Sequence, residues 1–170
     1  MKQYKAGIIG LGFIGAADQV SGDVLGQQVE NLDGTHIVGY ESHPRVDVIA
    51  GSSRDPGRRE RFAARTGAKT YELWRILLEK ETFDIISVAT YAPYHAEITV
   101  ACAEAGVPAI YCEKPIATKL EDANRMVEAC DKAGSLLVLN HQRRFNTNCR
   151  KLRDYIAAGE IGEMTSASNE

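Results

Sequence analysis

Short apolar runs alternate along the chain with longer amphipathic stretches, most of which end at a glycine. Short runs bounded by turn residues indicate buried strands, whereas apolar positions that recur every three or four residues indicate helices. The predicted strands are 6–9, 46–50, 85–89, 108–112 and 136–139, and 69–71 is predicted as a short extended link. The predicted helices are 36–41, 57–66, 72–80, 95–105, 119–133 and 146–158, and the sequence at 118–121 has the form of a capping box.

Strands and helices alternate throughout the chain. This order predicts an α/β fold with a doubly wound parallel sheet, covered on both faces by right-handed crossovers. In such sheets, ligands bind at the carboxyl ends of the strands. Glycine-rich or polar motifs fall at these predicted ends, at Gly10, Ser53, Thr90, Glu113 and His141. Their shared location predicts a single site at one edge of the sheet.

The first predicted strand runs directly into Gly10-x-Gly12-x-x-Gly15, with Phe13 and Ile14 inside the motif. In a dinucleotide site the first glycine permits a tight turn, the second lets backbone N–H groups approach a pyrophosphate, and the third lets the helix pack closely on the strand. The helix N-terminus then favours a phosphate, because unpaired N–H donors and the positive end of the dipole face it. In a chain with 15 glycines the pattern alone is weak, but its place after an N-terminal strand predicts a nucleotide site.

The helix that should follow the glycine turn is interrupted at about residues 18–35, where turn signals accumulate. We interpret this stretch as an inserted loop. Two interpretations of it remain open. It is either a surface excursion from the helix start or a loop that covers the cofactor or lines the substrate pocket, since long loops without regular structure are often functional.

The end of the strand at 46–50 bears on the choice between NAD and NADP. An NAD site normally places a carboxylate there for the ribose hydroxyls, whereas an NADP site places small polar and cationic groups at the 2′-phosphate. Here the sequence reads Ser53-Arg54, and Asp55 is expected to cap the next helix. Because a guanidinium can bind a phosphate through paired hydrogen bonds, the sequence favours NADP, with Ser53 and Arg54 as ligands. The alternative is that Arg54 is a solvated loop cation.

The motif Glu113-Lys114-Pro115 places a lysine at the end of the predicted strand 108–112. An ammonium group there can hydrogen-bond a substrate hydroxyl or carbonyl and polarise it, although a loop lysine is more often simply solvated. His95 begins a predicted helix and His141 ends a strand, and histidines at such positions are more often structural than catalytic. No two histidines have the spacing of a metal pair, so we predict no metal site.

The charge and cysteine content of the chain indicate which kinds of partner it binds and in which compartment it lies. With 20 basic and 23 acidic residues in 170, the net charge of −3 gives no positive excess for binding nucleic acid or an anionic membrane, so a small-molecule ligand fits better. The four cysteines, Cys102, Cys112, Cys130 and Cys149, form no CxxC pair, and we predict reduced core thiols in a cytoplasmic protein. No apolar run approaches the length of a membrane span, and the first residues do not have the pattern of a signal peptide.

The segments GLGFIG, VATYAPYH, AGVPAIYCEKPIA, NHQRRF and GEIGEM together resemble the nucleotide-binding domain of the glucose-fructose oxidoreductase/inositol dehydrogenase (Gfo/Idh/MocA) family. The resemblance covers nearly the whole chain, and the EKP motif is a more specific part of it than the glycines. It implies a Rossmann-type fold. It also implies NAD(P)-dependent oxidation of a hydroxyl of a sugar, cyclitol or related polyol, or the reverse reduction.

The resemblance also implies roles for individual residues. Lys114 matches the family lysine that lies near the nicotinamide and contacts the substrate, and His141 and Arg144 match the segment that leads toward the substrate domain. Thr90 and His95 match loop residues beside the cofactor. Lys114 and His141 are the predicted catalytic residues. The predicted cofactor-binding residues are Gly10, Gly12, Phe13, Ile14, Gly15, Ser53, Arg54, Thr90, His95, Glu113, Lys114 and Pro115.

The chain departs from the family pattern in several places. Thr90-Tyr91-Ala92 stands where the family usually has a Thr-Pro-Asn turn, and Ser53 stands where the family often has an acidic residue. The insertion separates Gly15 from His36, which in many relatives lies only a few residues after the glycine turn. These departures put NAD use in doubt and imply a rebuilt loop on the nicotinamide side.

Family members continue into a second domain that supplies most of the substrate pocket, the oligomer interface and a histidine thought to take the hydroxyl proton. We predict that residues 1–158 form the NAD(P)-binding domain and that 159–170 begin the second domain, which is otherwise absent from this chain. The chain is then either a fragment of a longer enzyme or a truncated natural product. A homo-oligomer is compatible with either origin.

Two other classes of function compete with a dehydrogenase. One is a non-catalytic module that binds or senses NAD(P)H. The other is a methyltransferase, whose sheet also opens with a glycine turn, but the residues just before Gly10 include no acidic side chain of the kind that such enzymes need.

Overall fold

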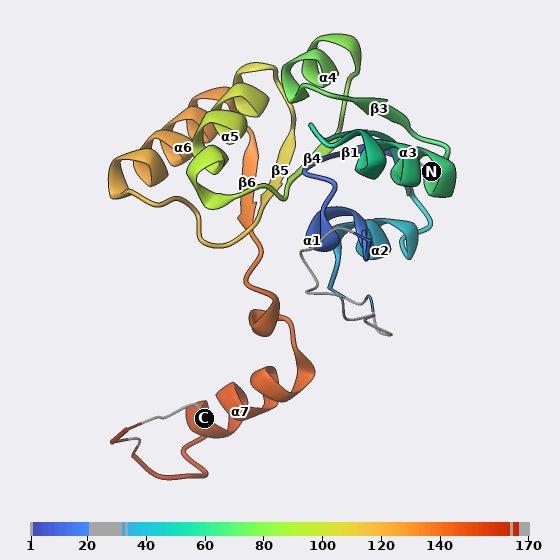
Figure 1. The fold of residues 1–170 in the computed structure, drawn as a ribbon. Coiled ribbons are helices and arrows are strands. Elements are labelled where there is room, and N and C mark those ends of the chain that lie inside the picture. Colours follow the sequence, from blue (N-terminus) through green and yellow to red (C-terminus); the bar gives the residue numbers. More distant parts are fainter. Residues whose placement is uncertain (1, 21–31, 33, 164, 167–170) are drawn as a thin grey trace. The chain divides into compact units, whose positions relative to one another are not determined.

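The structure, a computed structural model, describes residues 2–20, 32, 34–163 and 165–166 (Figure 1). The strands are β1 (Tyr4–Ile9), β2 (Val46–Ser52), β3 (Lys69–Tyr71), β4 (Ile85–Val88), β5 (Ala109–Cys112) and β6 (Leu136–Leu139). The helices are α1 (Phe13–Ala16), α2 (His36–Glu41), α3 (Pro56–Thr66), α4 (Trp74–Lys80), α5 (His95–Glu104), α6 (Leu120–Ala133) and α7 (Thr147–Ala157), with short 3-10 helices η2 (Ala92–Tyr94) and η3 (Gln142–Arg144). The predicted alternation is confirmed, and the link at 69–71 is a strand of the sheet.

The strands form one six-stranded sheet in the order β3-β2-β1-β4-β5-β6. Every neighbouring pair is parallel. The chain winds outward from β1 to β3, returns to place β4 on the other side of β1, and then winds outward again to β6. The predicted doubly wound parallel sheet is therefore confirmed, and its switch point, where such sheets bind ligands, lies between β1 and β4.

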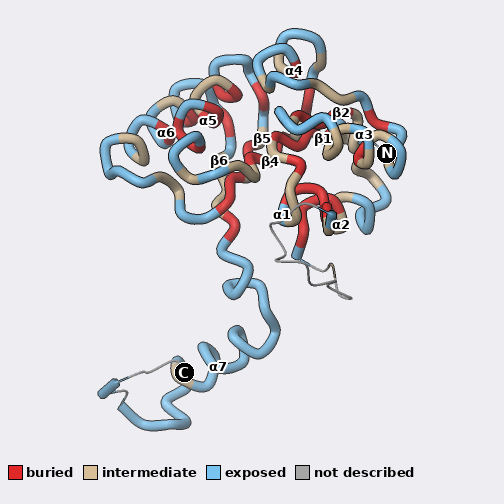
Figure 2. The backbone as a smooth tube through the Cα atoms, in the orientation of Figure 1, coloured by how far each residue is buried: buried red, intermediate tan, exposed pale blue. Residues whose placement is uncertain are grey.

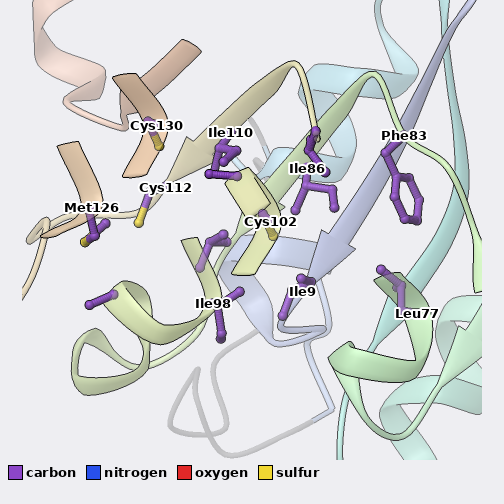
Figure 3. Close-up of a cluster of buried hydrophobic side chains, with 14 of the residues drawn as sticks. Ile9, Leu77, Phe83, Ile86, Ile98, Cys102, Ile110, Cys112, Met126 and Cys130 are labelled. Carbon is purple, nitrogen blue, oxygen red and sulfur yellow. The ribbon is translucent and has the colours of Figure 1, made fainter. Parts of the chain in front are cut away.

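Alternate residues of β1 enter two separate hydrophobic clusters. Ile8 packs in a cluster with Phe62 of α3, whereas Ile9 packs in one with Ile98 of α5 and Met126 of α6. Because successive strand residues point to opposite faces, helices α1 to α3 cover one face of the sheet and α5 and α6 cover the other. Figure 2 shows buried residues both in the central strands and in helices that pack on them, such as α5, and Figure 3 shows the cluster around Ile9.

Three of the four cysteines are core thiols, as predicted. Cys102, Cys112 and Cys130 are buried in the cluster that includes Ile9, whereas Cys149 is exposed. Cys149 lies on α7, a helix with no buried residue. The prediction of a core thiol was wrong for Cys149, because the described residues do not cover the helix that contains it.

The chain separates into two compact units, Met1–Asn140 and His141–Glu170. The second contains η3 and α7, and Asn146 caps α7 by accepting hydrogen bonds from the backbone of Asn148 and Cys149. The packing boundary after Asn140 differs from the division at residue 158, which rests on the end of the last predicted helix. The assignment of 159–170 to a further domain stays a prediction.

Two helix starts were predicted from capping residues. Asp55 caps α3 as expected, because its carboxylate accepts the Arg58 N–H. The predicted capping box at 118–121 was wrong: Lys119 is the N-cap of α6 and makes no side-chain cap hydrogen bond. The helix begins one residue later than the box requires, so Glu121 lies in its first turn. There the positive end of the helix dipole stabilises its negative charge.

The helix after the glycine turn stops after one turn, because Ala17 adopts a left-handed conformation with φ of 52°. Asp18 then accepts two hydrogen bonds from the Arg61 guanidinium, at 2.9 and 2.8 Å, and Arg65 donates to the Ala16 carbonyl. These contacts fix the start of the predicted insertion against α3. Most of that insertion lies outside the described residues, so both interpretations of it stay predictions, and the helix resumes at His36 as predicted.

Candidate functional site

Backbone hydrogen bonds align the carboxyl ends of the strands beyond their last paired residues. The N–H of Gly10 donates to the Ser52 carbonyl at 2.9 Å, and the N–H of Ala89 donates to Ile9 at 2.8 Å. Farther along the same edge, Glu113 donates to Val88 and Asn140 donates to Cys112. The residues at the predicted strand ends from Ser53 to Glu113 therefore lie along one edge of the sheet.

The glycine turn at the end of β1 is tightly packed. Gly10 has φ of +103°, and a Cβ at this position would lie 2.3 Å from the Ala89 carbonyl oxygen. A Cβ at Gly15 would lie 2.0 Å from the Gly10 carbonyl oxygen. Gly12 is the N-cap of α1, and the side chain of Ile14 is 41% exposed. The tight turn and the close packing of helix on strand that a dinucleotide site needs are both present.

The loop after β2 brings cationic side chains to the same edge. Arg54 is exposed, and its guanidinium lies 5.8 Å from the centre of the Tyr94 ring in η2. The Arg59 guanidinium of α3 donates to the carbonyls of Ser53 and Arg54 at 2.6 and 3.0 Å, and these hydrogen bonds hold the loop against α3. Since β1 lies between β2 and β4, the contact between Arg54 and Tyr94 spans the end of β1.

His95 joins two loops of the site instead of facing into it. Its ring is 1% exposed, and its two nitrogens each lie 2.9 Å from a carbonyl oxygen, Nε2 from Thr90 and Nδ1 from Pro115. Among the described residues, the buried Thr90 hydroxyl has no hydrogen-bond partner. The part of His95 in cofactor binding stays a prediction, and its contacts make that part indirect: it holds the Thr90 loop against the Lys114-Pro115 turn.

The three residues of the EKP motif differ in their exposure to solvent. Lys114 and Pro115 are exposed and are joined by a cis peptide bond, whereas Glu113 is 8% exposed. The Glu113 carboxylate accepts hydrogen bonds from His36 Nε2 at 2.9 Å, from the Asn140 side-chain amide and from the Lys114 backbone N–H at 3.2 Å. Burial would raise the pKa of Glu113, but the hydrogen bonds from His36 and Asn140 outweigh burial and the pKa lies below its usual value.

Sequence reasoning missed the buried polar network that surrounds Glu113. His36 Nδ1 lies 2.7 Å from Ser87 Oγ, and the Tyr40 hydroxyl lies 2.7 Å from the same oxygen. The Tyr111 hydroxyl donates to Asn140 Oδ1 at 2.6 Å. The sequence offers one signal for this network, namely polar residues such as Ser87 inside otherwise apolar strands.

Two predicted site residues belong to the second unit. His141 and Arg144 are exposed there, and their roles stay predictions. Among the described residues, no three His, Cys, Asp or Glu side chains come together in a way that could hold a metal ion. None of the helices in the described part of the chain is long and apolar enough to cross a membrane.

A doubly wound sheet whose first strand ends in a glycine turn at the switch point defines a dinucleotide-binding domain of the Rossmann type. The chain belongs to the Gfo/Idh/MocA oxidoreductase family, because the family model described as "Oxidoreductase family, NAD-binding Rossmann fold" matches residues 4–141. The predicted family and fold are thus confirmed.

Relatives with assigned names are dehydrogenases and reductases. The chain is 32% identical over 137 residues to inositol 2-dehydrogenase 3 of Saccharopolyspora erythraea, a match that covers 76% of this chain and 40% of the relative. It is 35% identical over 122 residues to 1,5-anhydro-D-fructose reductase of Ensifer adhaerens, covering 71% and 36%. Among solved structures, WlbA dehydrogenase of Bordetella pertussis in complex with NADH and UDP-GlcNAcA superposes with a TM-score of 0.79 at 26% identity, covering 95% and 42%. The chain therefore spans well under half the length of these relatives.

Proposed function

We propose that the protein is an NAD(P)-dependent oxidoreductase that acts on a hydroxyl of a sugar, cyclitol or related polyol, and that this chain is its cofactor-binding half. The names of the relatives support this substrate class. One observation in the structure supports it most directly: exposed Lys114 follows β5 at the edge where the glycine turn ends β1. The net charge of −3 further supports a small-molecule partner, and the free, buried thiols of Cys102, Cys112 and Cys130 support a cytoplasmic location.

The residues at this edge fit a dinucleotide. Gly10, Gly12 and Gly15 form the tight turn and close helix packing that a pyrophosphate site needs, and the buried, unpartnered Thr90 hydroxyl is a polar atom to which a ligand can hydrogen-bond. The nicotinamide supplies the hydride acceptor or donor when it is bound. Lys114 binds the substrate oxygen and polarises it, and His141 is the second proposed catalytic residue. His95 keeps the Thr90 loop beside Lys114.

We test this function first by calorimetric titration of the chain with NADPH and, separately, with NADH. Binding of either cofactor, followed by polyol-dependent change in nicotinamide absorbance in the complete protein, supports the proposal. Binding without turnover across aldoses and cyclitols would instead support a sensing module. Failure of both cofactors to bind would contradict the assigned site.

The choice of cofactor leans to NADP because Ser53 and Arg54 follow β2 in place of a carboxylate. Replacing Arg54 by alanine is expected to weaken NADPH binding by about tenfold or more, since a hydrogen bond to a charged group contributes roughly 1.5–3 kcal/mol. NADH has no 2′-phosphate, so its affinity should change little. Calorimetric dissociation constants for both cofactors measure the difference.

Arg125→Ala serves as the matched control for this prediction. Arg125 is an exposed arginine of α6 whose guanidinium donates to Asp122 on the same helix. Its removal should leave both dissociation constants unchanged. Equal loss of NADH and NADPH binding in Arg54→Ala would show that Arg54 does not read the 2′-phosphate.

A further inference from the structure

Three separate parts of the chain meet at the Glu113 carboxylate. His36 begins α2, Asn140 directly follows β6, and Lys114 is the next residue in the turn. One carboxylate oxygen accepts from the His36 ring and from the Asn140 amide, and the other accepts from the Lys114 backbone N–H. The carboxylate thus connects the start of α2 to the main chain of the lysine proposed to contact substrate.

The hydrogen bonds around His36 can be assigned in one consistent direction. Burial raises the pKa of Tyr40 to about 12, and in this assignment its hydroxyl donates to Ser87 Oγ. Ser87 in turn donates to His36 Nδ1, which leaves Nε2–H to donate to the ionised Glu113. Each polar hydrogen then has one acceptor, and both nitrogens of the His36 ring are held by hydrogen bonds.

Tyr111 and Asn140 form a second chain of hydrogen bonds to the same carboxylate. The Tyr111 ring lies 4.8 Å from the His36 ring, centre to centre, and its hydroxyl donates to Asn140 Oδ1. That bond orients the Asn140 amide so that its nitrogen faces Glu113. His36 and Glu113 are 4% and 8% exposed, so water competes little for these bonds.

We propose that His36 is a positioning residue for Lys114, acting through the Glu113 carboxylate. The inference rests on the proposed function and extends it to a residue that touches neither the glycine turn nor the substrate lysine. Stability alone is a weak reason for this arrangement, because replacing a buried hydrogen-bonded network by apolar residues of the same shape can be nearly neutral for stability. A fixed carboxylate, in contrast, sets the direction of the Lys114 backbone and so the point from which its side chain extends.

Two substitutions separate the two contacts of His36. In His36→Gln the amide nitrogen takes the place of Nε2, so the donor to Glu113 is kept and the Ser87 contact is lost. In His36→Asn the amide takes the place of Nδ1, so the Ser87 contact is kept and the donor to Glu113 is lost. Both variants remove the ring, but asparagine is one methylene shorter than glutamine, so Ser87→Ala, which leaves the ring in place, is measured beside them.

The first measurement is the backbone amide resonance of Lys114 in nitrogen-labelled protein, which requires no substrate. We expect it to shift in His36→Asn and to stay near its original position in His36→Gln. The second is turnover of the complete protein at saturating cofactor, which should fall by about 100-fold in His36→Asn, because misplacing a reacting group by about 1 Å can cost that much. It should fall only a few-fold in His36→Gln, and cofactor dissociation constants should change little in either.

An unchanged Lys114 resonance in His36→Asn would overturn the inference, as would equal losses of turnover in the two variants. If His36→Asn does not fold, Ser87→Ala provides the second comparison. It removes the Ser87 contact at Nδ1 but keeps the His36 ring, whose Nε2 still faces the Glu113 carboxylate as its acceptor, so a shifted Lys114 resonance in Ser87→Ala with an unshifted one in His36→Gln would also count against the inference. Absence of turnover in the unaltered protein would contradict the proposed function, whereas the resonance comparison would still decide the role of His36.

Discussion

Replacing Gly15 by alanine is expected to abolish dinucleotide binding and to lower the free energy of unfolding by about 2 kcal/mol or more. The new Cβ would lie 2.0 Å from the Gly10 carbonyl oxygen and 3.0 Å from the Ala89 Cβ. Both neighbours belong to the close-packed turn, so α1 must move away from β1. That movement displaces the N–H groups of the turn from the pyrophosphate. Calorimetry with NADPH and NADH measures binding, and urea unfolding measures stability.

Gly39→Ala is the matched control for this substitution. Gly39 lies inside α2, and a Cβ there would have no heavy atom within 4 Å. Alanine in a helix interior is more favourable than glycine by roughly 0.5–1 kcal/mol, so this variant should be slightly more stable and should bind both cofactors normally. If Gly15→Ala retained the cofactor affinity of Gly39→Ala, the glycine turn would not be the dinucleotide site.

Replacing Lys114 by alanine is expected to lower turnover of the complete protein by about 100- to 10,000-fold, the usual contribution of a positioned acid or base. Lys114 is exposed, so unfolding free energy should change by no more than about 0.5 kcal/mol. The glycine turn, not Lys114, is proposed to bind the pyrophosphate, so the cofactor dissociation constant should change much less than turnover. Steady-state kinetics at saturating cofactor and calorimetry separate the two effects.

Lys132→Ala provides the control, because Lys132 is an exposed lysine in the last turn of α6. It should turn over substrate at the unaltered rate. Lys114→Arg keeps the positive charge but changes the shape of the donor, and we expect it to restore little activity. A large loss of cofactor binding with normal turnover at saturation would refute the role assigned to Lys114.

The sequence was sufficient to predict the sheet and its order of elements, since those depend on local patterns. The apolar strands and the capping Asp55 are both short-range signals, and both predictions were confirmed. The predicted capping box was wrong by one residue. Because the helix begins at Leu120, Glu121 is its second residue and not the third, which the reciprocal hydrogen bond of a capping box requires. The prediction that Cys149 is a core thiol was wrong for a different reason. Burial depends on which surface covers a helix, and no local sequence pattern contains that information.

The candidate site could be predicted only in part. The glycine motif and the EKP motif are each short and each directly follow a predicted strand. Their location at one edge of the sheet therefore followed from the rule that parallel strands end at the same edge. The network around Glu113 joins residues that lie in or directly after α2, β4, β5 and β6 and are far apart in sequence, such as His36, Ser87 and Asn140. Only the fold brings them together. The same holds for His95. The sequence showed that it lies in a motif beside the predicted site, but not that its side chain is buried.

The central place of β1 has a consequence for synthesis on the ribosome. β1 pairs with β2 on one side and with β4 on the other, and Asp84, just before β4, accepts the Lys5 N–H. A nascent chain can therefore pair β1 with β2, and β2 with β3, early, but the other edge of β1 stays unpaired until residues 85–88 have emerged. An apolar strand with one open edge is prone to aggregate, and pairing over so long a separation is slow. Chaperones that bind extended apolar segments should accordingly contact the first strand throughout that interval of translation.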